Sequence, residues 1–189
     1  MRKMIGLIIS SYKEIKSVRC ITLIAMLGAI SIVLGYFTFM PVEIIKITFN
    51  FLPNEFVFYL FGPVVGAVYG AALDILTFII RPAGPFFYGF TVSAVLTGII
   101  YGFILYQRPL SLKRIIAANL IHMVLITILL NTYWLTELFG YQYTAILPLR
   151  TLKAVILLPI ETALLFTLLK SAEATGILRG FQHKKTKVT

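Results

Sequence analysis

The sequence predicts an all-α integral membrane protein, a single domain of residues 1–189 built as a bundle of six transmembrane helices. Two observations carry this prediction. Hydrophobic residues make up 59% of the chain and charged residues only 13%, whereas soluble domains hold about 45–50% and about 25%, and disordered chains are far less apolar. The apolar residues also gather in runs of about 20, the length that crosses a hydrocarbon core of about 30 Å.

Five apolar stretches supply the crossings. They are residues 20–39, 56–80, 86–106, 115–135 and 145–169. In the second stretch Gly62 precedes Pro63, a pair that breaks helices because glycine adopts unusual backbone angles and proline lacks an N–H donor. If this break is a tight turn, a short helix that begins near residues 53–55 precedes it, and the chain crosses six times.

The distribution of Lys and Arg selects six crossings over five. Short cytoplasmic loops collect Lys and Arg, and with six helices and a cytoplasmic N-terminus all but four of the seventeen lie on that side. With five helices the seventeen would divide almost evenly. The four that remain outside are Lys46, Arg81, Arg150 and Lys153. Topology therefore explains the net charge of +10, and nucleic acid is not needed as a partner.

The same topology divides the domain into a basic cytoplasmic segment 1–18, a bundle 19–170 and a basic cytoplasmic tail 171–189. The first segment is predicted as a short helix at the membrane surface, with a poorly ordered tail as the alternative. Residues 41–54 fall outside, between the first two helices, and are too polar to span. From Ile45 to Asn50 apolar and polar residues alternate, which predicts a strand or an extended lid with one apolar face.

A cationic pair lies near the outer end of the last crossing. Arg150 and Lys153 are three residues apart and share one helix face. Cations on the outer side run against the topological bias, so the pair predicts an anionic ligand, and a ligand with two carboxylates would suit it. Glu161 follows about three turns deeper on nearly the same face. The alternative is that both cations extend to lipid headgroups.

Aromatic and amide side chains form a second candidate site at the outer ends of other crossings. Asn131, Tyr133 and Trp134 stand near the end of the fifth crossing, and Phe87 and Tyr88 follow the outer turn before the fourth. They predict a surface that stacks on a flat heterocycle while the amide reads its edge. An aromatic belt at the membrane interface is the alternative, although an amide in lipid is costly and does not fit a belt.

Two further features have both a structural and a functional interpretation. Asp74 lies inside an apolar stretch, where a carboxyl faces a cavity or serves as a buried hydrogen-bond partner. Ala25 and Ala29 are four residues apart in the first crossing and form a flat face on which another helix packs closely, within the bundle or in a partner.

Signatures of catalysis and metal binding are missing from the sequence. Cys20 is the single cysteine, His122 and His183 are the two histidines, and there is no P-loop lysine. We therefore predict no catalytic residue, no metal site and no cofactor. An ATPase would need a soluble nucleotide-binding domain that this chain cannot contain, so the motor of any uphill transport is another chain.

Together these features resemble the substrate-binding S component of energy-coupling factor (ECF) vitamin transporters over nearly the whole chain. The resemblance rests on the spacing of Ala25 and Ala29, the Gly62-Pro63 turn with Gly66, Gly70 and Asp74 after it, and the run PFFYGFTVSAVLTG at residues 85–98. The runs LNTYWL at residues 130–135 and LPLRTLK at residues 147–153 are similar to the folate-specific branch.

The resemblance implies a protein that captures folate or a related pteridine at the outer face of a bacterial plasma membrane. It would deliver the ligand inward through a transmembrane coupling subunit and two cytoplasmic ATPases, with Ala25 and Ala29 at the coupling-subunit contact. The outer loops would close over the vitamin. Their expected gating residues are Phe49, Asn50, Arg81 and Pro82.

With folate as the ligand, the chemistry of these residues predicts their roles in binding. Arg150 and Lys153 would hold the glutamyl carboxylates, and Asn131 or Asp74 would read the edge of the pterin. The residues expected to stack on the pterin are Trp134, Tyr133, Phe87 and Tyr88.

Three alternatives stay open at the level of the sequence. The first keeps the class and changes the vitamin to pantothenate, riboflavin or thiamine, although riboflavin lacks a carboxylate and thiamine is a cation. The second is a membrane-embedded enzyme acting on lipid, for which Asp74, His122 and Glu161 are the candidate groups. The third is an assembly subunit that binds no ligand.

Overall fold

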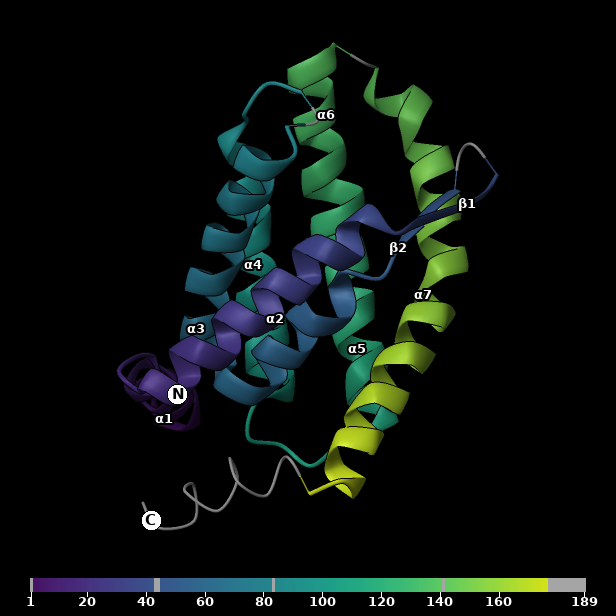
Figure 1. Cartoon of the computed structure of the whole chain (residues 1–189). Helices are drawn as coiled ribbons and strands as arrows, with labels where there is room; N and C mark the ends of the chain where they lie inside the picture. The colour runs from purple at the N-terminus through teal and green to yellow at the C-terminus, as the bar shows by residue number, and fades with distance from the viewer. Residues whose placement is uncertain (1, 43–44, 83, 141, 177–189) are drawn as a thin grey trace.

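The computed structural model describes residues 2–42, 45–82, 84–140 and 142–176. Within these ranges, five helical spans are long and apolar enough to cross a membrane, which confirms a multi-pass membrane protein. Figure 1 shows the helices and strands, coloured in chain order. In chain order they are α1 (Arg2–Ile15), α2 (Val18–Tyr36), β1 (Thr38–Val42), β2 (Ile45–Thr48), α3 (Phe51–Ile80), α4 (Tyr88–Leu105), α5 (Leu112–His122), the π-helix η1 (Met123–Leu130), α6 (Asn131–Phe139) and α7 (Tyr143–Ala174).

Helix α3 is folded back on itself at Gly62. The φ and ψ angles there are 83° and −168°, a conformation that favours glycine. The Tyr69 hydroxyl donates to Asn54 Oδ1 over 2.7 Å, whereas these residues would lie about 22 Å apart in a straight helix. The predicted tight turn is therefore present, and it gives the bundle six apolar arms. The first arm, residues 51–61, is only about 16 Å long.

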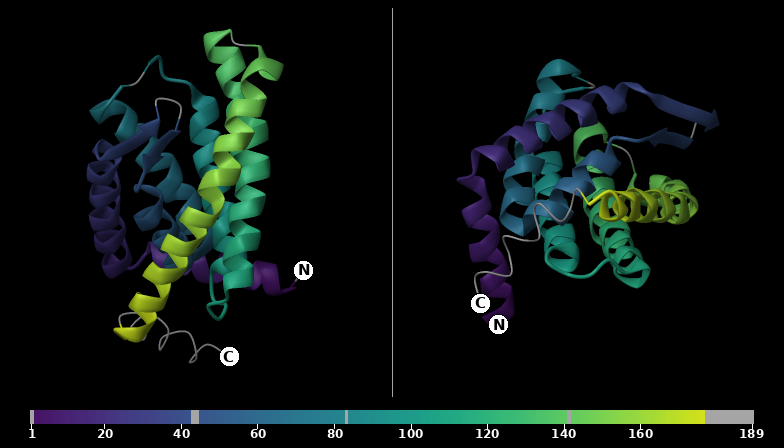
Figure 2. Two further views of the ribbon diagram at one scale, coloured as in Figure 1. Left: turned by 90° about the vertical axis from the view of Figure 1, so that its right-hand side faces the viewer. Right: turned by 60° about the horizontal axis from the view of Figure 1, so that its bottom comes forward.

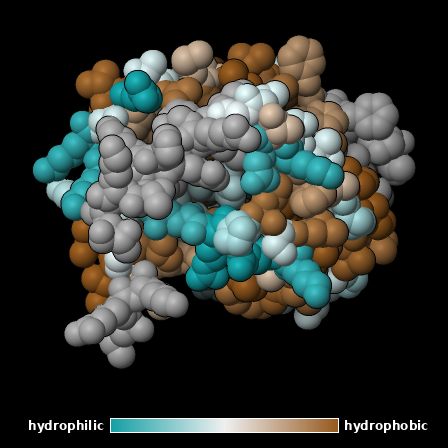
Figure 3. Space-filling view, turned by 90° about the horizontal axis from the view of Figure 1, so that it is seen from below, coloured by the Kyte–Doolittle hydropathy of each residue, from teal (hydrophilic) through white to brown (hydrophobic). Residues whose placement is uncertain are grey.

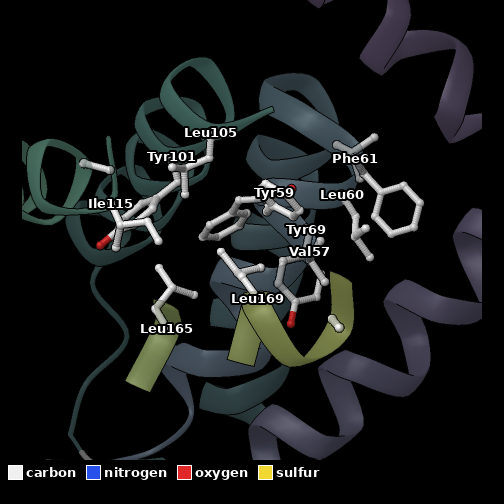
Figure 4. Close-up of a cluster of buried hydrophobic side chains, with 14 of the residues drawn as sticks. Val57, Tyr59, Leu60, Phe61, Tyr69, Tyr101, Leu105, Ile115, Leu165 and Leu169 are labelled. Atoms are coloured by element: carbon white, nitrogen blue, oxygen red, sulfur yellow. The ribbon is translucent and has the colours of Figure 1, made fainter. Parts of the chain in front are cut away.

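The second arm of α3 packs closely against α4 through glycines. A Cβ atom on Gly98 would collide with the backbone of Gly66, and one on Gly70 would collide with the carbonyl of Ala94. Small residues allow helix backbones to approach closely in lipid, where burial of apolar surface supplies little driving force. The buried side chains continue this core across α3, α4, α5 and α7 (Figure 4). Completely or almost completely buried members are Val57, Phe61, Tyr101, Ile115, Leu165 and Leu169.

The segment between α2 and α3 forms an antiparallel β-hairpin, so the all-α prediction needs one addition. Thr38 pairs with Thr48, and Phe39 pairs with Ile47. The alternating pattern from Ile45 onward predicted β2, but the first helix was extended too far, to residue 39. The chain leaves the helix at Tyr36 because β1 begins two residues later to pair with β2.

The remaining two spans run antiparallel beside each other. Helices α5, η1 and α6 form one continuous span, and α7 returns along it. The Asn119 amide donates to Thr162 Oγ1 over 2.9 Å and thereby links α5 to α7. Helix α7 continues to Ala174, beyond the predicted end of the bundle at residue 170. Residues 177–189 of the predicted tail and residue 83 of the outer turn lie outside the described residues.

Candidate functional site

A polar cavity of about 240 Å³ lies between α7, the α5–η1 span and the junction of β2 with α3. Three separate parts of the chain therefore meet around it, and the β-hairpin brings its C-terminal end to the wall. Its lining residues are Thr48, Asn50, Phe51, Asn119, His122, Met123, Thr127, Arg150, Lys153, Ala154, Leu157, Leu158 and Glu161.

The cationic pair predicted from the sequence lines this cavity. Arg150 and Lys153 reach it from α7, and Asn50 faces them from the start of α3. The Nε atom of Arg150 is buried and has no hydrogen-bond partner among the described residues. A buried donor without an acceptor costs about 1–3 kcal/mol, and more when it is charged. A hydrogen-bond acceptor at this position would remove that cost, and a carboxylate is the strongest acceptor.

The other end of the cavity is formed by acidic and amide groups. Glu161 lies about 16 Å along α7 from Arg150 and lines the same cavity together with Asn119 and His122. The Tyr101 hydroxyl donates to Asn119 Oδ1 over 2.9 Å, and the Asn119 amide donates to Thr162. These bonds fix the orientation of the Asn119 side chain. The cavity thus has a cationic end and an end with a fixed amide and a carboxyl.

The predicted stacking residues gather in one place, but they are not among the residues that line the cavity. Phe87 stacks on Tyr88 with ring centroids 5.0 Å apart, and Phe87 lies 5.6 Å from Trp134. The ring centroids of Tyr133 and Trp134 are 5.2 Å apart. Trp134 Nε1 also donates to Ser93 Oγ over 3.1 Å. This aromatic cluster joins the start of α4 to α6.

The two groups expected to read the edge of a heterocycle have different surroundings. Asp74 accepts a hydrogen bond of 2.6 Å from the Thr91 hydroxyl, which links α3 to α4. Asn131 begins α6, and its Oδ1 is buried without a hydrogen-bond partner among the described residues. Neither residue belongs to the cavity lining. The functional interpretation of Asp74 thus competes with a structural role that the Thr91 bond supports.

The expected gating residues divide between two segments, one before α3 and one after it. Asn50 lines the cavity, and its carbonyl accepts a hydrogen bond of 3.0 Å from Ser31 of α2. Phe49 beside it is half-buried. Arg81 donates to the carbonyl of Gly35 over 3.0 Å and lies over the ring of Tyr36, so it ties the end of α3 to the end of α2. Pro82 is exposed.

Sequence reasoning missed part of the cavity wall. Asn119, Met123 and Thr127 were not predicted. Glu161 was predicted on nearly the same helix face as Arg150, and the only function considered for Glu161 and His122 was in a lipid enzyme. The structure brings these last two together and leaves Asp74 out. One signal was available for Asn119, since an amide inside an apolar run is costly in lipid and needs partners.

A second hollow, which is apolar, runs along α2 and the second arm of α3. Ala25, Gly28 and Ala29 line it from α2, and Val68 and Ala72 line it from α3. Its volume is about 390 Å³. Ala25 and Ala29 of the predicted close-packing face of α2 are exposed and are not covered by another described helix. The face has the small residues that a partner helix needs for close approach.

These features define a helical membrane protein with a polar cavity and an apolar groove. The chain belongs to the family described as "ECF transporter, substrate-specific component", whose model matches residues 19–177. Two curated relatives are each called "Folate transporter FolT". The one from Clostridium novyi (strain NT) is 32% identical over 163 residues, which are 86% of this chain and 95% of the relative. The one from Leuconostoc mesenteroides subsp. mesenteroides is 26% identical over 81% of this chain and 85% of its own length.

Solved structures agree with this placement. A structure described as "Crystal structure of FolT bound with folic acid" matches with a TM-score of 0.72 and 31% identity, over 80% of this chain and 93% of that chain. A second, described as "Structure and mechanism of the S component of a bacterial ECF transporter", matches with a TM-score of 0.59. Its identity is 20%, over 84% of this chain and 97% of that one, so it supports the fold alone.

Proposed function

We propose that this chain is the folate-binding S component of an ECF-type importer, which captures folate at the outer face of a bacterial plasma membrane. The observation that carries the proposal is the cationic end of the polar cavity. There the buried Nε of Arg150 lacks an acceptor among the described residues, and Lys153 lines the same end. A folate tail carries two carboxylates, which are suitable acceptors. The relatives named as folate transporters and the folic acid bound to the matching FolT structure support the same ligand.

We also propose an orientation for folate in the cavity. The glutamyl carboxylates would lie against Arg150 and Lys153, and the pterin would lie toward Glu161 and Asn119. A pterin has a ring N–H and an amino group side by side, so it offers two parallel donors to a carboxyl. Its ring carbonyl accepts from an amide. Charge-assisted, bidentate hydrogen bonds of this kind give both affinity and geometric specificity. Glu161 thereby takes the edge-reading role that the sequence suggested for Asn131 or Asp74.

The placement in the membrane and the partners complete the proposal. Both termini would lie in the cytoplasm, and the β1–β2 hairpin would act as the outer lid of the cavity. Ala25 and Ala29 in the apolar groove would contact a transmembrane coupling subunit, which in turn would be driven by two ATPases. The chain itself would carry no catalytic group, no metal and no cofactor, and folate would be its transported ligand.

The two ends of the cavity also favour folate over the other vitamins considered. Riboflavin has no carboxylate to occupy the Arg150 end, and thiamine brings a cation to a cationic pair. Pantothenate is an anion without a flat ring that offers parallel donors to Glu161.

A ligand panel tests this function directly. Purified protein is titrated with folate, pantothenate, riboflavin and thiamine while the emission of Trp134, the single tryptophan, is followed. We expect saturable binding of folate with the highest affinity. Preferential binding of another vitamin would overturn the ligand assignment. Absence of any saturable binding, with retained binding to a coupling subunit, would indicate an assembly subunit, and a co-purified phospholipid product would indicate a lipid enzyme.

A further inference from the structure

Helix α1 lies across the lower end of the bundle instead of along it (Figures 1 and 2). One side of the helix is fixed to the bundle by serine side chains. Ser11 is fully buried, and its hydroxyl donates to the carbonyl of Phe61 over 2.6 Å. The same hydroxyl accepts from the backbone N–H groups of Val64 and Val65 over 3.1 Å. Ser11 thus satisfies backbone groups that the break at Gly62 withdraws from the helix.

A second serine extends the attachment to the turn after α4. The Gln107 amide donates to Ser10 Oγ over 2.7 Å, and Ser10 Oγ lies 3.1 Å from the Tyr106 hydroxyl. Helix α1 therefore spans two turns of the bundle, at residues 61–65 and at residues 106–107. Both turns are at the end where the sequence predicts the cytoplasmic side.

Beside these contacts, α1 has an exposed apolar sector. Its exposed fractions run from 41% to 54%. The exposed large hydrophobic residues of α1 are Met4, Ile5, Ile8, Ile9 and Tyr12. At about 100° per residue, Ile5, Ile8 and Tyr12 share one sector, whereas Gly6 lies about 160° around the helix from Ile8. Crosswise orientation and a single apolar sector are the properties of a helix that lies in a membrane interface.

The segment that carries this apolar sector is basic. Residues 2–19 contain Arg2, Lys3, Lys13, Lys16 and Arg19 against the single acid Glu14. Lys16 Nζ lies 5.6 Å from the centre of the Tyr12 ring, so a cation and an interfacial aromatic side chain stand together. Seen from below, this end of the molecule also gathers hydrophilic side chains over its middle with hydrophobic ones along much of the rim (Figure 3).

We infer that α1 is a binding surface for acidic phospholipids of the cytoplasmic leaflet. The apolar sector enters the boundary between headgroups and acyl chains, and Lys13 and Lys16 contact the anionic headgroups. The charge of the segment selects lipid over a protein partner, because an acidic leaflet attracts every cation of a juxtamembrane cluster. Since Ser11 caps the break in α3, this attachment also holds the Gly62 turn at the level of the headgroups.

The experiment uses the full chain in nanodiscs of phosphatidylcholine, with or without phosphatidylglycerol. An environment-sensitive fluorophore is attached to Ile8→Cys or, as the matched control, to Gly6→Cys, where an added side chain meets no neighbour. Cys20 is 1% exposed, so the wild type gives the labelling background. We expect a blue shift at position 8 and quenching by brominated acyl chains, both stronger with phosphatidylglycerol, and neither at position 6.

Charge reversal separates lipid binding from a general effect of charge. Lys13→Glu with Lys16→Glu should abolish the dependence on phosphatidylglycerol, since each cation near an acidic surface contributes about fivefold to binding. Lys113→Glu with Arg114→Glu, the same charge change on α5, should leave it in place. The inference would be overturned if the fluorophore at position 8 showed no blue shift, or if its quenching did not depend on phosphatidylglycerol. A blue shift at position 8 that appears only when a coupling subunit is added would show that α1 binds a protein partner, and would also overturn the inference.

Discussion

The polar cavity on α7 and the apolar groove on α2 are hollows in the same bundle, and they are lined by different chemistry. The cavity contains a guanidinium, an ammonium, a carboxyl and two amides, and Arg150 Nε is buried there without an acceptor among the described residues. The groove is lined by small and aliphatic side chains, with Tyr69 as its one polar group. Unsatisfied buried polarity indicates a small polar ligand, whereas a row of small residues indicates a helix that approaches closely.

This difference separates two functions that a single hollow could not combine. A ligand is held best where charged groups are partly removed from water, because their interactions strengthen in a low dielectric. A partner subunit in lipid is held by close packing, for which charges are a cost. We therefore expect substitutions in the cavity to change ligand affinity alone, and substitutions in the groove to change assembly alone. The four predictions below test this separation.

The largest effect is expected at the cationic end of the cavity. Arg150→Ala should weaken folate binding about 100-fold, because loss of a buried charged hydrogen-bond partner costs about 2–5 kcal/mol. Lys153→Ala should act in the same direction. The measurement is equilibrium titration of purified protein. Lys170→Ala removes an equal charge from an exposed position on α7 outside the cavity and should leave the affinity unchanged. Unchanged affinity in both Arg150→Ala and Lys153→Ala would remove the carboxylate role.

Blocking the groove should produce the next largest effect, on assembly. Ala29→Leu places a larger side chain in the groove, and overpacking by about 1–3 kcal/mol should lower recovery of the complex with a coupling subunit about tenfold or more. Folate affinity should not change. Co-purification of the two chains is the readout. The matched control is Ala163→Leu, which adds the same bulk to an exposed site on α7. A loss of folate affinity in Ala29→Leu would contradict the separation of the two hollows.

At the other end of the cavity, Glu161→Gln should lower folate affinity about tenfold, since a hydrogen bond to a charged group contributes about 1.5–3 kcal/mol. Calorimetry with two fragments of folate locates the effect. Pteroate, which keeps the pterin, should lose affinity in the variant, whereas p-aminobenzoylglutamate, which lacks it, should not. Equal losses for both fragments would show that Glu161 supports the cavity without contacting the pterin.

The smallest effect is expected in the aromatic cluster. Trp134→Phe keeps an aromatic ring and removes the bond to Ser93, so the free energy of unfolding should fall by about 1 kcal/mol. Folate affinity, measured by calorimetry because the variant lacks tryptophan, should stay within about threefold, since the ring does not line the cavity. A loss comparable to that of Arg150→Ala would place the pterin on this cluster and restore the stacking role predicted from the sequence.

Much of the fold could be predicted because its signals are local. Apolar runs, the Gly62-Pro63 pair and the alternation after Ile45 each depend on residues adjacent in the chain. The resulting predictions of a membrane bundle, a tight turn and a strand are present in the structure. The end of the first helix was misplaced because Phe37, Thr38 and Phe39 are as compatible with a membrane helix as with a strand, and only pairing with β2 decides between them.

The candidate site was only half predictable. Arg150, Lys153 and Glu161 belong to one helix, so helical periodicity alone puts them on one face. Asn119 and Thr127 belong to a different span, which has apolar residues on every face. In such a helix the hydrophobic pattern does not distinguish the face toward lipid from the face toward the bundle. For the aromatic residues, side-chain chemistry predicts stacking but not the direction in which the end of each helix points.

The sequence by itself therefore determined the class of the protein, its number of helical arms and the cationic face of α7, because composition and periodicity act along the chain. Tertiary structure alone decided that Asn119 and Glu161 share a cavity with Arg150, that Asp74 pairs with Thr91, and that Ala25 and Ala29 line an open groove. The physical reason is that the surrounding lipid and the interior of the helical bundle are equally apolar. The way each helix is rotated is set by interhelical contacts and not by its own pattern.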